Sequence, residues 1–572
     1  MKNLISFLAC VIIACVFVQY RQSTISTAKE SPTVFTTWDA FGYYMYLPSA
    51  FIYDDFTELE WVQEMDEKYD LVGGDMYQSN KYTNGNYVNK YLGGVSLMQA
   101  PLFMVGHIVA LNTDYPADGF SLPYQLSLGY GVLLYCMLAL FMLRKILLRY
   151  FDDMAVAVSL ILMFLATNLV QYIPIEAGQS HPYIFPLYVL VLYTTIKWHE
   201  RPKSIWAGLT GLIIGLATIC RPTEAIMFLI PLLWATHTKD EKSRKWALVK
   251  ENRSHIIYAV LFGVIGIIPQ LIYWKMTSGE LIYNVGSSWR FLTPFFRVLV
   301  GWEIGWFIYT PITIFFIIGL FKIKKFPFKR SVIVFCLLNM WIVISWADWR
   351  YGATYSTRAL VQSFPIFALP FTAIIERINF TKWKYPFYAL GLYLIFVNLF
   401  QIEQYNDTIL HYRDMNRLYY SRIYLNNDVN SLDMSLLDTD EVLDDHSSHT
   451  EGVLHTSNEL INVSMENRLL WNEKAVTVAK DHWLRVDAEI KADYGFTSSH
   501  LHCKIISGKV IKERKVRLFN AISKPGDFND YAFYVRVPDN MTKVDLEVFI
   551  GTLDNFVGQL RKIKVTHLST KL

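Results

Sequence analysis

The sequence predicts a mainly α-helical protein that crosses a membrane many times and carries a C-terminal β-sandwich domain. Of its 572 residues, 53% are hydrophobic and only 18% are charged. The apolar residues fall in blocks of about 16–25 residues that end at charged clusters, which is long enough to cross a hydrocarbon core about 30 Å thick. After residue 402 these blocks stop, and short runs of alternating apolar and polar residues follow.

About eleven membrane-spanning helices are expected from the apolar blocks. The first follows Lys2 and resembles a signal peptide, but further spans follow it and no clear cleavage site is visible, so we expect a retained anchor. The expected spans are residues 3–20, 124–144, 155–173, 182–197, 205–220, 222–236, 256–274, 303–321, 331–347, 359–376 and 384–402.

The connecting segments sort by charge, which predicts the orientation. Basic residues concentrate in segments 144–149, 197–203, 239–253, 322–330 and 377–384. The alternate connections, 174–181, 275–302 and 348–358, hold fewer basic residues and many Gly, Ser, Trp and Tyr. Basic loops face the cytoplasm. We therefore expect an integral protein of a bacterial inner membrane, with a cytoplasmic N-terminus and with Asp39 and the C-terminal domain outside.

Residues 92–111 test this arrangement, because they are apolar enough to count as a further span. Counting them would place the basic segment 144–149 outside and invert every later loop. We therefore expect them to lie in the outer interface. The first external loop then extends from about 21 to 123, longer than a connector requires, and loops of this size are typically functional.

The composition changes after the last expected span. We expect a transmembrane domain over residues 1–402, a linker over 403–451 and an external domain over 452–572. In that domain Trp483–Ile490, Tyr531–Val537 and Val544–Ile550 alternate apolar and polar residues. Alternation bounded by turn residues is typical of antiparallel strands, and several such strands predict a β-sandwich.

The charge and cysteine patterns exclude other classes of site. The net charge of +3 and the lack of a basic stripe argue against a nucleic-acid partner. Five of the six cysteines lie in apolar blocks and Cys503 lies alone in the C-terminal domain, so no disulfide framework or metal-ligand spacing follows. Asp54 and Asp55 could coordinate a divalent cation, but paired acids in a loop are more often solvated. We expect no metal and no cofactor.

Polar residues are unusually frequent at the external ends of the spans. They are Glu176, His181, Arg221, Glu224, Asp348, Arg350 and Arg358. A charged group at the edge of the hydrocarbon costs free energy unless it is paired or solvated. Their presence predicts a shared polar cavity at the outer face, in which the arginines could hold a phosphate or diphosphate.

Asp39 stands in an otherwise uncharged aromatic stretch that contains Tyr43 and Tyr44, soon after the first span. A carboxylate there could act as a general base at the membrane boundary. The alternative for Asp39 is a helix N-cap. For Arg221 and Arg358 the alternatives are snorkelling or an ion pair with a neighbour, and for Glu176 and His181 a hydrogen bond to each other.

These features resemble the GT-C superfamily of membrane glycosyltransferases, which includes protein O-mannosyltransferases and aminoarabinose transferases. The resemblance covers about residues 1–400 and depends on the order of its motifs. The matching segments are Asp39 with Tyr43-Tyr44 and Leu47-Pro48, Asn89-Lys90-Tyr91 with Gly93-Gly94, Asp118–Ser121 with Pro123–Gln125, Glu176 with Ser180-His181, Arg221–Thr223, and Trp349 with Gly352 and Arg358.

The resemblance implies transfer of a sugar from a polyprenyl-phosphate donor to a glycan, lipid or protein acceptor at the outer membrane face, with inversion. It implies Asp39 as the general base and Arg221, Arg358 and Lys90 as ligands of the donor phosphate. The expected substrate cavity contains Tyr43, Tyr44, Tyr91, Glu176, His181, Glu224, Asp348 and Arg350. The chain lacks the acidic pair that some relatives carry in the first loop, which weakens the expectation of a catalytic metal.

Two other classes of function remain open at this point. A transporter or flippase of lipid-linked glycan would place polar residues near mid-membrane on several helices, whereas most lie at external ends here. A non-catalytic sensor or assembly protein with a β-sandwich ectodomain is the other alternative.

Overall fold

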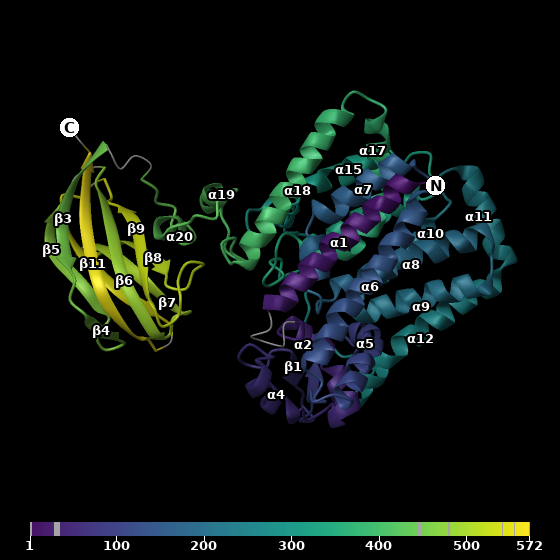
Figure 1. Ribbon diagram of the computed structural model, residues 1–572, viewed down its shortest axis with the longest axis horizontal. Coiled ribbons are helices and arrows are strands. Elements are labelled where there is room, and N and C mark those ends of the chain that lie inside the picture. The colour runs from purple at the N-terminus through teal and green to yellow at the C-terminus, as the bar shows by residue number, and fades with distance from the viewer. Residues whose placement is uncertain are drawn as a thin grey trace. The chain divides into compact units, whose positions relative to one another are not determined.

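The computed structural model describes residues 3–27, 35–443, 448–478, 481–539, 541–553 and 555–570. It separates into two compact units, Met1–Ile402 and Glu403–Leu572 (Figure 1). Ala28, one of the small residues that follow the first expected span, and residues 444–447 of the expected linker lie outside the described residues.

The first unit is built from helices and one short hairpin. Its N-terminal third contains α1 (Leu4–Thr27), α2 (Asp39–Tyr44), α3 (Tyr46–Pro48), η2 (Ser49–Tyr53), α4 (Trp61–Tyr69), β1 (Ser79–Lys81), β2 (Tyr87–Asn89), α5 (Gly94–Leu111) and α6 (Leu122–Leu147). The middle contains α7 (Asp153–Leu165), η3 (Gln171–Ile175), α8 (His181–Glu200), α9 (Ser204–Cys220), η4 (Pro222–Phe228), α10 (Leu229–Leu233), α11 (Lys239–Glu251) and α12 (Arg253–Thr277). The remainder contains α13 (Arg297–Val300), α14 (Trp306–Tyr309), η5 (Pro311–Thr313), α15 (Ile314–Leu320), α16 (Lys329–Ser345), η6 (Arg358–Ser363), α17 (Phe364–Asn379) and α18 (Lys384–Asn406), whose last turn enters the second unit.

The predicted spans are mainly helical, which confirms the polytopic α-helical class, although span 155–173 is broken between the end of α7 at Leu165 and η3. Among the described residues six helical segments are long and apolar enough to cross a membrane: Leu4–Ile25, Gly94–Leu111, Leu122–Leu147, Arg253–Thr277, Arg358–Asn379 and Lys384–Asn406. The predicted spans 222–236 and 303–321 are interrupted helices that begin or continue with 3-10 turns at proline. Proline at the start of a turn costs no backbone hydrogen bond, so these breaks are compatible with an apolar environment.

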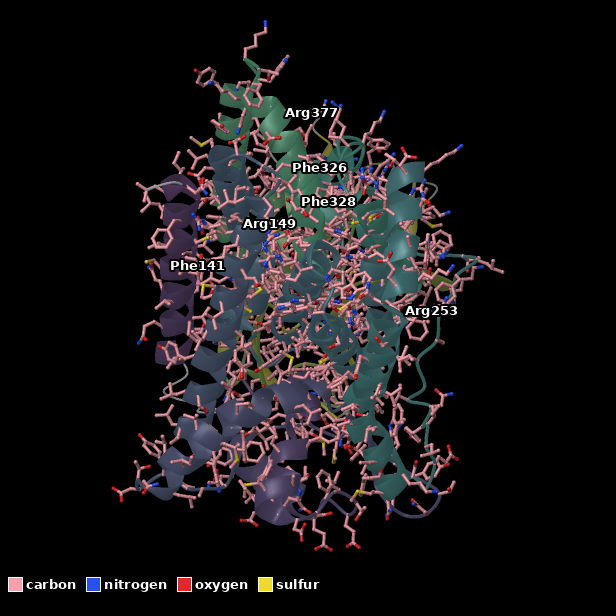
Figure 2. All side chains as sticks on the ribbon, turned by 90° about the vertical axis from the view of Figure 1, so that its right-hand side faces the viewer. Phe141, Arg149, Arg253, Phe326, Phe328 and Arg377 are labelled. Atoms are coloured by element: carbon pink, nitrogen blue, oxygen red, sulfur yellow. The ribbon has the colours of Figure 1, made fainter. Side chains whose placement is uncertain are left out.

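The basic connections meet at one end of the first unit. Phe151 and Phe326 pack with ring centroids 5.1 Å apart, and the backbone N–H of Asp152 donates to Glu376 at 3.0 Å. Arg149 pairs with Glu200 at the end of α8. In Figure 2 Arg149, Phe326, Phe328 and Arg377 lie in the same part of the unit. The charge asymmetry in the sequence therefore corresponds to a real separation of the two sets of connections.

Helix α5 does not join the two ends of this unit. It begins against the end of α9, where a Cβ on Gly94 would lie 2.4 Å from the backbone nitrogen of Cys220. It then runs antiparallel to the first half of α6, because Tyr135 donates to the Met98 carbonyl at 3.3 Å and His107 lies 2.5 Å from the Tyr124 hydroxyl. The helix therefore stays on the side away from the basic connections.

Helices α9 and α12 pack through glycine. A Cβ on Gly211 would lie 1.8 Å from the Ala259 carbonyl oxygen, and one on Gly215 would lie 2.2 Å from that of Gly263. Small residues let two membrane helices approach closely. Van der Waals packing then holds the helices together, since the hydrophobic effect does not act between them in lipid. This contact fixes α12, most of whose other surface is exposed.

The second unit contains two short helices and an antiparallel β-sandwich, which confirms the predicted C-terminal class. The helices are α19 (Arg417–Ile423) and α20 (Ser431–Ser435), within the segment expected to be a linker. One sheet has the order β5-β10-β7-β8 and the other β3-β11-β6-β9, with β4 paired to β11. The strands are β3 (His449–Ser457), β4 (Ile461–Ser464), β5 (Leu469–Thr477), β6 (Trp483–Tyr494), β7 (Ser499–Ser507), β8 (Lys509–Arg517), β9 (Phe528–Arg536), β10 (Lys543–Thr552) and β11 (Val557–Thr570).

The sandwich follows from period-two alternation in its strands. In β6 the buried residues Leu484, Val486 and Ile490 alternate with more exposed polar neighbours, so one face of the strand turns into a continuous apolar core. Arg517, the last residue of β8, forms an ion pair with Asp438 at 2.8 Å and so joins the segment after α20 to the sheet. The predicted strand ranges 483–490 and 544–550 lie within β6 and β10, and 531–537 lies within β9 except for Val537, one residue past its end.

Candidate active site

A cavity of about 680 Å³ lies where the non-basic connections of the first unit converge. Its wall combines the first loop, the start of α8, the end of α9, the loop after α12 and the region around η6. The charged or ionisable residues of the wall include Asp39, Tyr43, Lys90, Tyr91, His181, Arg221, Glu224 and Arg358. These residues lie far apart in the sequence, and the helix ends bring them to one place.

Asp39 is held in this cavity by three side chains. Its Oδ1 accepts hydrogen bonds from Tyr77 at 2.8 Å and Tyr91 at 2.6 Å, while its Oδ2 lies 3.0 Å from Nη2 of Arg358. Asp39 is the first residue of α2, and the N-cap position is Trp38, which makes no side-chain capping bond. The helix N-cap interpretation of Asp39 is therefore wrong, since its carboxylate binds tertiary partners instead.

The protein favours the charged form of Asp39. Partial burial acts to raise the pKa of this carboxyl, but the Arg358 guanidinium and the hydroxyls of Tyr91 and Tyr77 outweigh it, so the pKa lies below its ordinary value. Burial, together with the negative charge of Asp39, raises the pKa of both tyrosines. Both tyrosines therefore remain protonated donors, and the carboxylate keeps its charge.

Local backbone geometry fixes Asp39 in this position. Trp38 has φ 56°, and its backbone N–H donates to the Leu71 carbonyl at 2.8 Å. One turn further along α2, Gly42 leaves room for the ring of Tyr91, which a Cβ would approach to 2.2 Å. A side chain at Gly42 would thus displace Tyr91 from Asp39.

Lys90 and Arg221 provide further positive charge to the cavity. Neither forms an ion pair with any of the residues that the structure describes. Arg221 has an extended backbone between the end of α9 and the 3-10 turn η4. It therefore belongs to neither helix, and it lines the cavity. Two cations that form no ion pair, beside the Asp39–Arg358 pair, make a cavity suited to a bound anion.

Glu224 and His181 belong to a second, buried network. The Tyr188 hydroxyl donates to one oxygen of Glu224, and Nε2 of Gln362 donates to the other at 3.0 Å. The Oε1 atom of Gln362 lies 2.8 Å from Nδ1 of His181. Glu176 and His181 therefore do not bond to each other, contrary to the capping alternative.

Four of the residues expected in the cavity lie outside its wall among the described residues. Tyr44 turns away, and its hydroxyl donates to the Gly119 carbonyl within the aromatic core of the first loop. Glu176 accepts a hydrogen bond from Gln171 at 3.0 Å, and burial raises its pKa. The guanidinium of Arg350 lies 5.1 Å from the Trp349 ring centroid, and the Asp348 carbonyl accepts from the Tyr351 N–H at 3.0 Å.

Sequence reasoning missed Tyr77 and Gln362. Gln362 is a polar residue inside a predicted apolar span, which is a signal that could have identified it. Tyr77 had no such signal, because tyrosine is common in this loop and only the folded hairpin β1–β2 brings it to Asp39. The structure also adds Trp274, Trp289 and Trp346 to the wall, and Trp289 and Trp346 pair through a β-bridge.

No group of three or more His, Cys, Asp or Glu side chains that could hold a metal ion occurs among the described residues. Metal independence stays a prediction, since a metal could also be held with the help of a substrate phosphate.

Comparison with known proteins gives structural neighbours only. No family model matches the chain, and no curated protein matches it. The oligosaccharyltransferase AglB from Archaeoglobus fulgidus, solved with an inhibitory peptide and a dolichol-phosphate, aligns with 11% identity and a TM-score of 0.41 over 73% of this chain and 57% of AglB. ArnT from Cupriavidus metallidurans aligns with 11% identity and a TM-score of 0.41, over 73% of this chain and 68% of ArnT.

The arabinosyltransferase EmbB from Mycobacterium smegmatis aligns with 9% identity and a TM-score of 0.37 over 98% of this chain and 64% of EmbB. These neighbours are GT-C glycosyltransferases. They belong to the class that the sequence resembles, although this chain spans less than two thirds of the length of AglB. At such low identities and TM-scores, neither reaction nor substrate is carried over from them, and the function has to be argued from the cavity.

Proposed function

We propose that the protein is a membrane glycosyltransferase that moves a sugar from a polyprenyl-phosphate donor to an acceptor hydroxyl or amide, with inversion. The observation that carries the proposal is the presence of ionised Asp39 in the same cavity as Lys90 and Arg221. A proton acceptor and an anion site within one cavity are the two requirements of this reaction. The cavity adjoins apolar helices, so a donor with a lipid tail suits it.

In the proposed step Asp39 takes the proton of the acceptor as the acceptor atom attacks the anomeric carbon. The bond from that carbon to the phosphate oxygen breaks, and the polyprenyl phosphate leaves with both electrons of the bond. Arg221 and Lys90 offset the charge that develops on the phosphate. Attack opposite to the leaving group inverts the anomeric centre.

The geometry changes the role proposed for Arg358. The resemblance implied that Arg358 holds the donor phosphate, but its Nη2 lies 3.0 Å from Asp39. We assign it instead to orienting the carboxylate and keeping it charged. The donor phosphate is then held by Arg221 and Lys90, whose charges have no acidic partner among the described residues.

We further propose that the cavity faces the outside of a bacterial inner membrane, with the basic connections in the cytoplasm. Tyr355 lies three residues before Arg358 of the cavity wall, and its hydroxyl donates to Asn398, in the second half of α18, at 3.1 Å. Helix α18 therefore leaves the first unit at the cavity end, which supports an extracytoplasmic C-terminal domain.

Replacing Asp39 with Asn tests the proposal, because the amide keeps the shape and loses the charge. Transfer by the full-length protein in nanodiscs, from radiolabelled polyprenyl-phosphate sugars to envelope acceptors, should fall roughly 10²–10⁴-fold. Binding of polyprenyl phosphate should survive in Asp39→Asn and weaken in Arg221→Gln.

Asp75→Asn is the matched control, since Asp75 lies exposed in the same loop. Undiminished transfer in Asp39→Asn would remove the general-base role. Unchanged phosphate binding in Arg221→Gln would remove the anion site.

A further inference from the structure

The buried network behind the cavity determines which nitrogen of His181 carries a proton. Its members are Tyr188, Glu224, Gln362 and His181, and the last three are each 2% exposed. Tyr188 and Gln362 donate to the two oxygens of Glu224, and Gln362 contacts Nδ1 of His181 at 2.8 Å. In a chain of buried groups that bond to one another, the donor at one bond sets the direction of the next.

The direction follows from what each group can donate. The Tyr188 hydroxyl and Nε2 of Gln362 both donate to Glu224, which accepts at its two carboxyl oxygens. Gln362 must therefore turn its NH₂ group toward Glu224 and its oxygen toward His181. A glutamine oxygen only accepts, so Nδ1 of His181 is the donor and carries the hydrogen.

Burial, together with the positive charges of Arg221 and Arg358, lowers the pKa of His181 well below its ordinary value, so the imidazole is neutral. Nε2 then bears a free lone pair. His181 lines the cavity, and none of the described residues forms a hydrogen bond with Nε2. Asp39 and Glu224, by contrast, already accept at both carboxylate oxygens from protein groups.

We propose that Nε2 of His181 accepts a hydrogen bond from a hydroxyl of the transferred sugar and so positions that sugar in the cavity. This assignment rests on the proposed function, since it takes the ligand of the cavity to be a sugar donor. His181 acts here as a specificity-determining residue: an analogue without the hydroxyl leaves the nitrogen without a partner. The Glu224–Gln362 pair acts through His181, because both oxygens of Glu224 already accept hydrogen bonds from protein groups.

Nitrogen NMR of the full-length protein, labelled with ¹⁵N-histidine in nanodiscs, tests the tautomer directly. The His181 signals are assigned by their loss in His181→Gln. Near pH 7.5 we expect a protonated Nδ1 and an unprotonated Nε2. Gln362→Leu should mix the two tautomers, while Tyr188→Phe, the matched control, should leave them unchanged because Gln362 still bonds to Glu224. A proton on Nε2 in the unmodified protein would overturn the proposal.

The ligand is tested with farnesyl phosphate and with its hexosyl and pentosyl esters. At least one sugar-bearing probe should shift the Nε2 resonance, and farnesyl phosphate alone should not. His181→Ala should weaken that probe roughly tenfold, the worth of about one hydrogen bond, and leave farnesyl phosphate binding unchanged. If no sugar-bearing probe moves the resonance more than farnesyl phosphate does, the assignment fails.

The tests of His181 and the test of Asp39 can fail independently of each other. Loss of transfer in Asp39→Asn with the wrong His181 tautomer would keep the proposed function and reject the role of His181. The expected tautomer and ligand shift with undiminished transfer in Asp39→Asn would keep the sugar contact and reject the proposed base.

Discussion

At the scale of single residues, the Asp39 carboxylate meets two opposing demands. Arg358, Tyr77 and Tyr91 keep it charged, which a proton acceptor requires, but they also lower its affinity for the proton. A substrate that displaced any of these donors would raise that affinity at the moment of reaction. In the absence of a substrate, Asp39 is therefore ionised.

This electrostatic arrangement predicts a pH profile. The folded-state pKa of Asp39 lies below its ordinary value of 3.8, so transfer should be fully present at neutral pH and lost only as pH falls through that lowered pKa. In Arg358→Gln burial is no longer opposed by the guanidinium, so the acidic limb should move to higher pH. The measurement is kcat/KM against pH.

Arg358→Lys retains the positive charge and serves as the control, with its limb close to that of the unmodified protein. Superimposable profiles for Arg358→Gln and the unmodified protein would contradict the role given to Arg358.

The sequence could indicate the charged residues of the cavity but not their partners. Asp39, Arg221 and Arg358 are recognisable because charge beside an apolar span costs free energy and therefore needs a reason. The contact between Asp39 and Arg358 is a property of the folded chain, and so is the contact with Tyr77. For the same reason the sequence indicated Arg358 as a ligand of the phosphate, whereas in the structure its guanidinium lies against Asp39.

At the scale of elements, the glycine contact between α9 and α12 supports the cavity wall. Arg221 follows α9 directly, and Trp274 of α12 lies in the wall, so the spacing of these helices sets one width of the cavity. The spans themselves were predictable from hydropathy. Their interruptions at η4 and η5 were not, because an apolar run has the same composition whether it is one helix or two.

Gly211→Ala should therefore destabilise the protein. Its Cβ would lie 1.8 Å from the Ala259 carbonyl oxygen, and overpacking of this kind costs about 1–3 kcal/mol. We expect a lower Tm in detergent and weaker binding of polyprenyl phosphate.

Gly208→Ala is the control, since its Cβ would meet the Phe262 ring at 3.3 Å and a side chain can move where a backbone cannot. Equal Tm values for the two variants would show that close helix packing at Gly211 is unimportant.

At the scale of the whole molecule, charge asymmetry in the connections makes the orientation testable. Single cysteines at Thr83, in the first loop, and at Lys382, between α17 and α18, would both be exposed to solvent. In intact cells a membrane-impermeant thiol reagent should label Thr83→Cys and reach Lys382→Cys only after permeabilisation. The native cysteines are buried or, for Cys15, placed in a predicted span. Labelling in the reverse order would invert the proposed topology.

Asp39 and Arg358 are 319 positions apart in the sequence, so the ribosome synthesises them at different times. At about 5–20 residues per second, a ribosome adds the arginine roughly 15–60 s after the aspartate. During that interval the first loop can leave the membrane while Asp39 still lacks its cationic partner. A nascent or truncated chain would thus carry the proposed base without the group that orients it. If the proposed function holds, the site would become complete only after η6 has been synthesised.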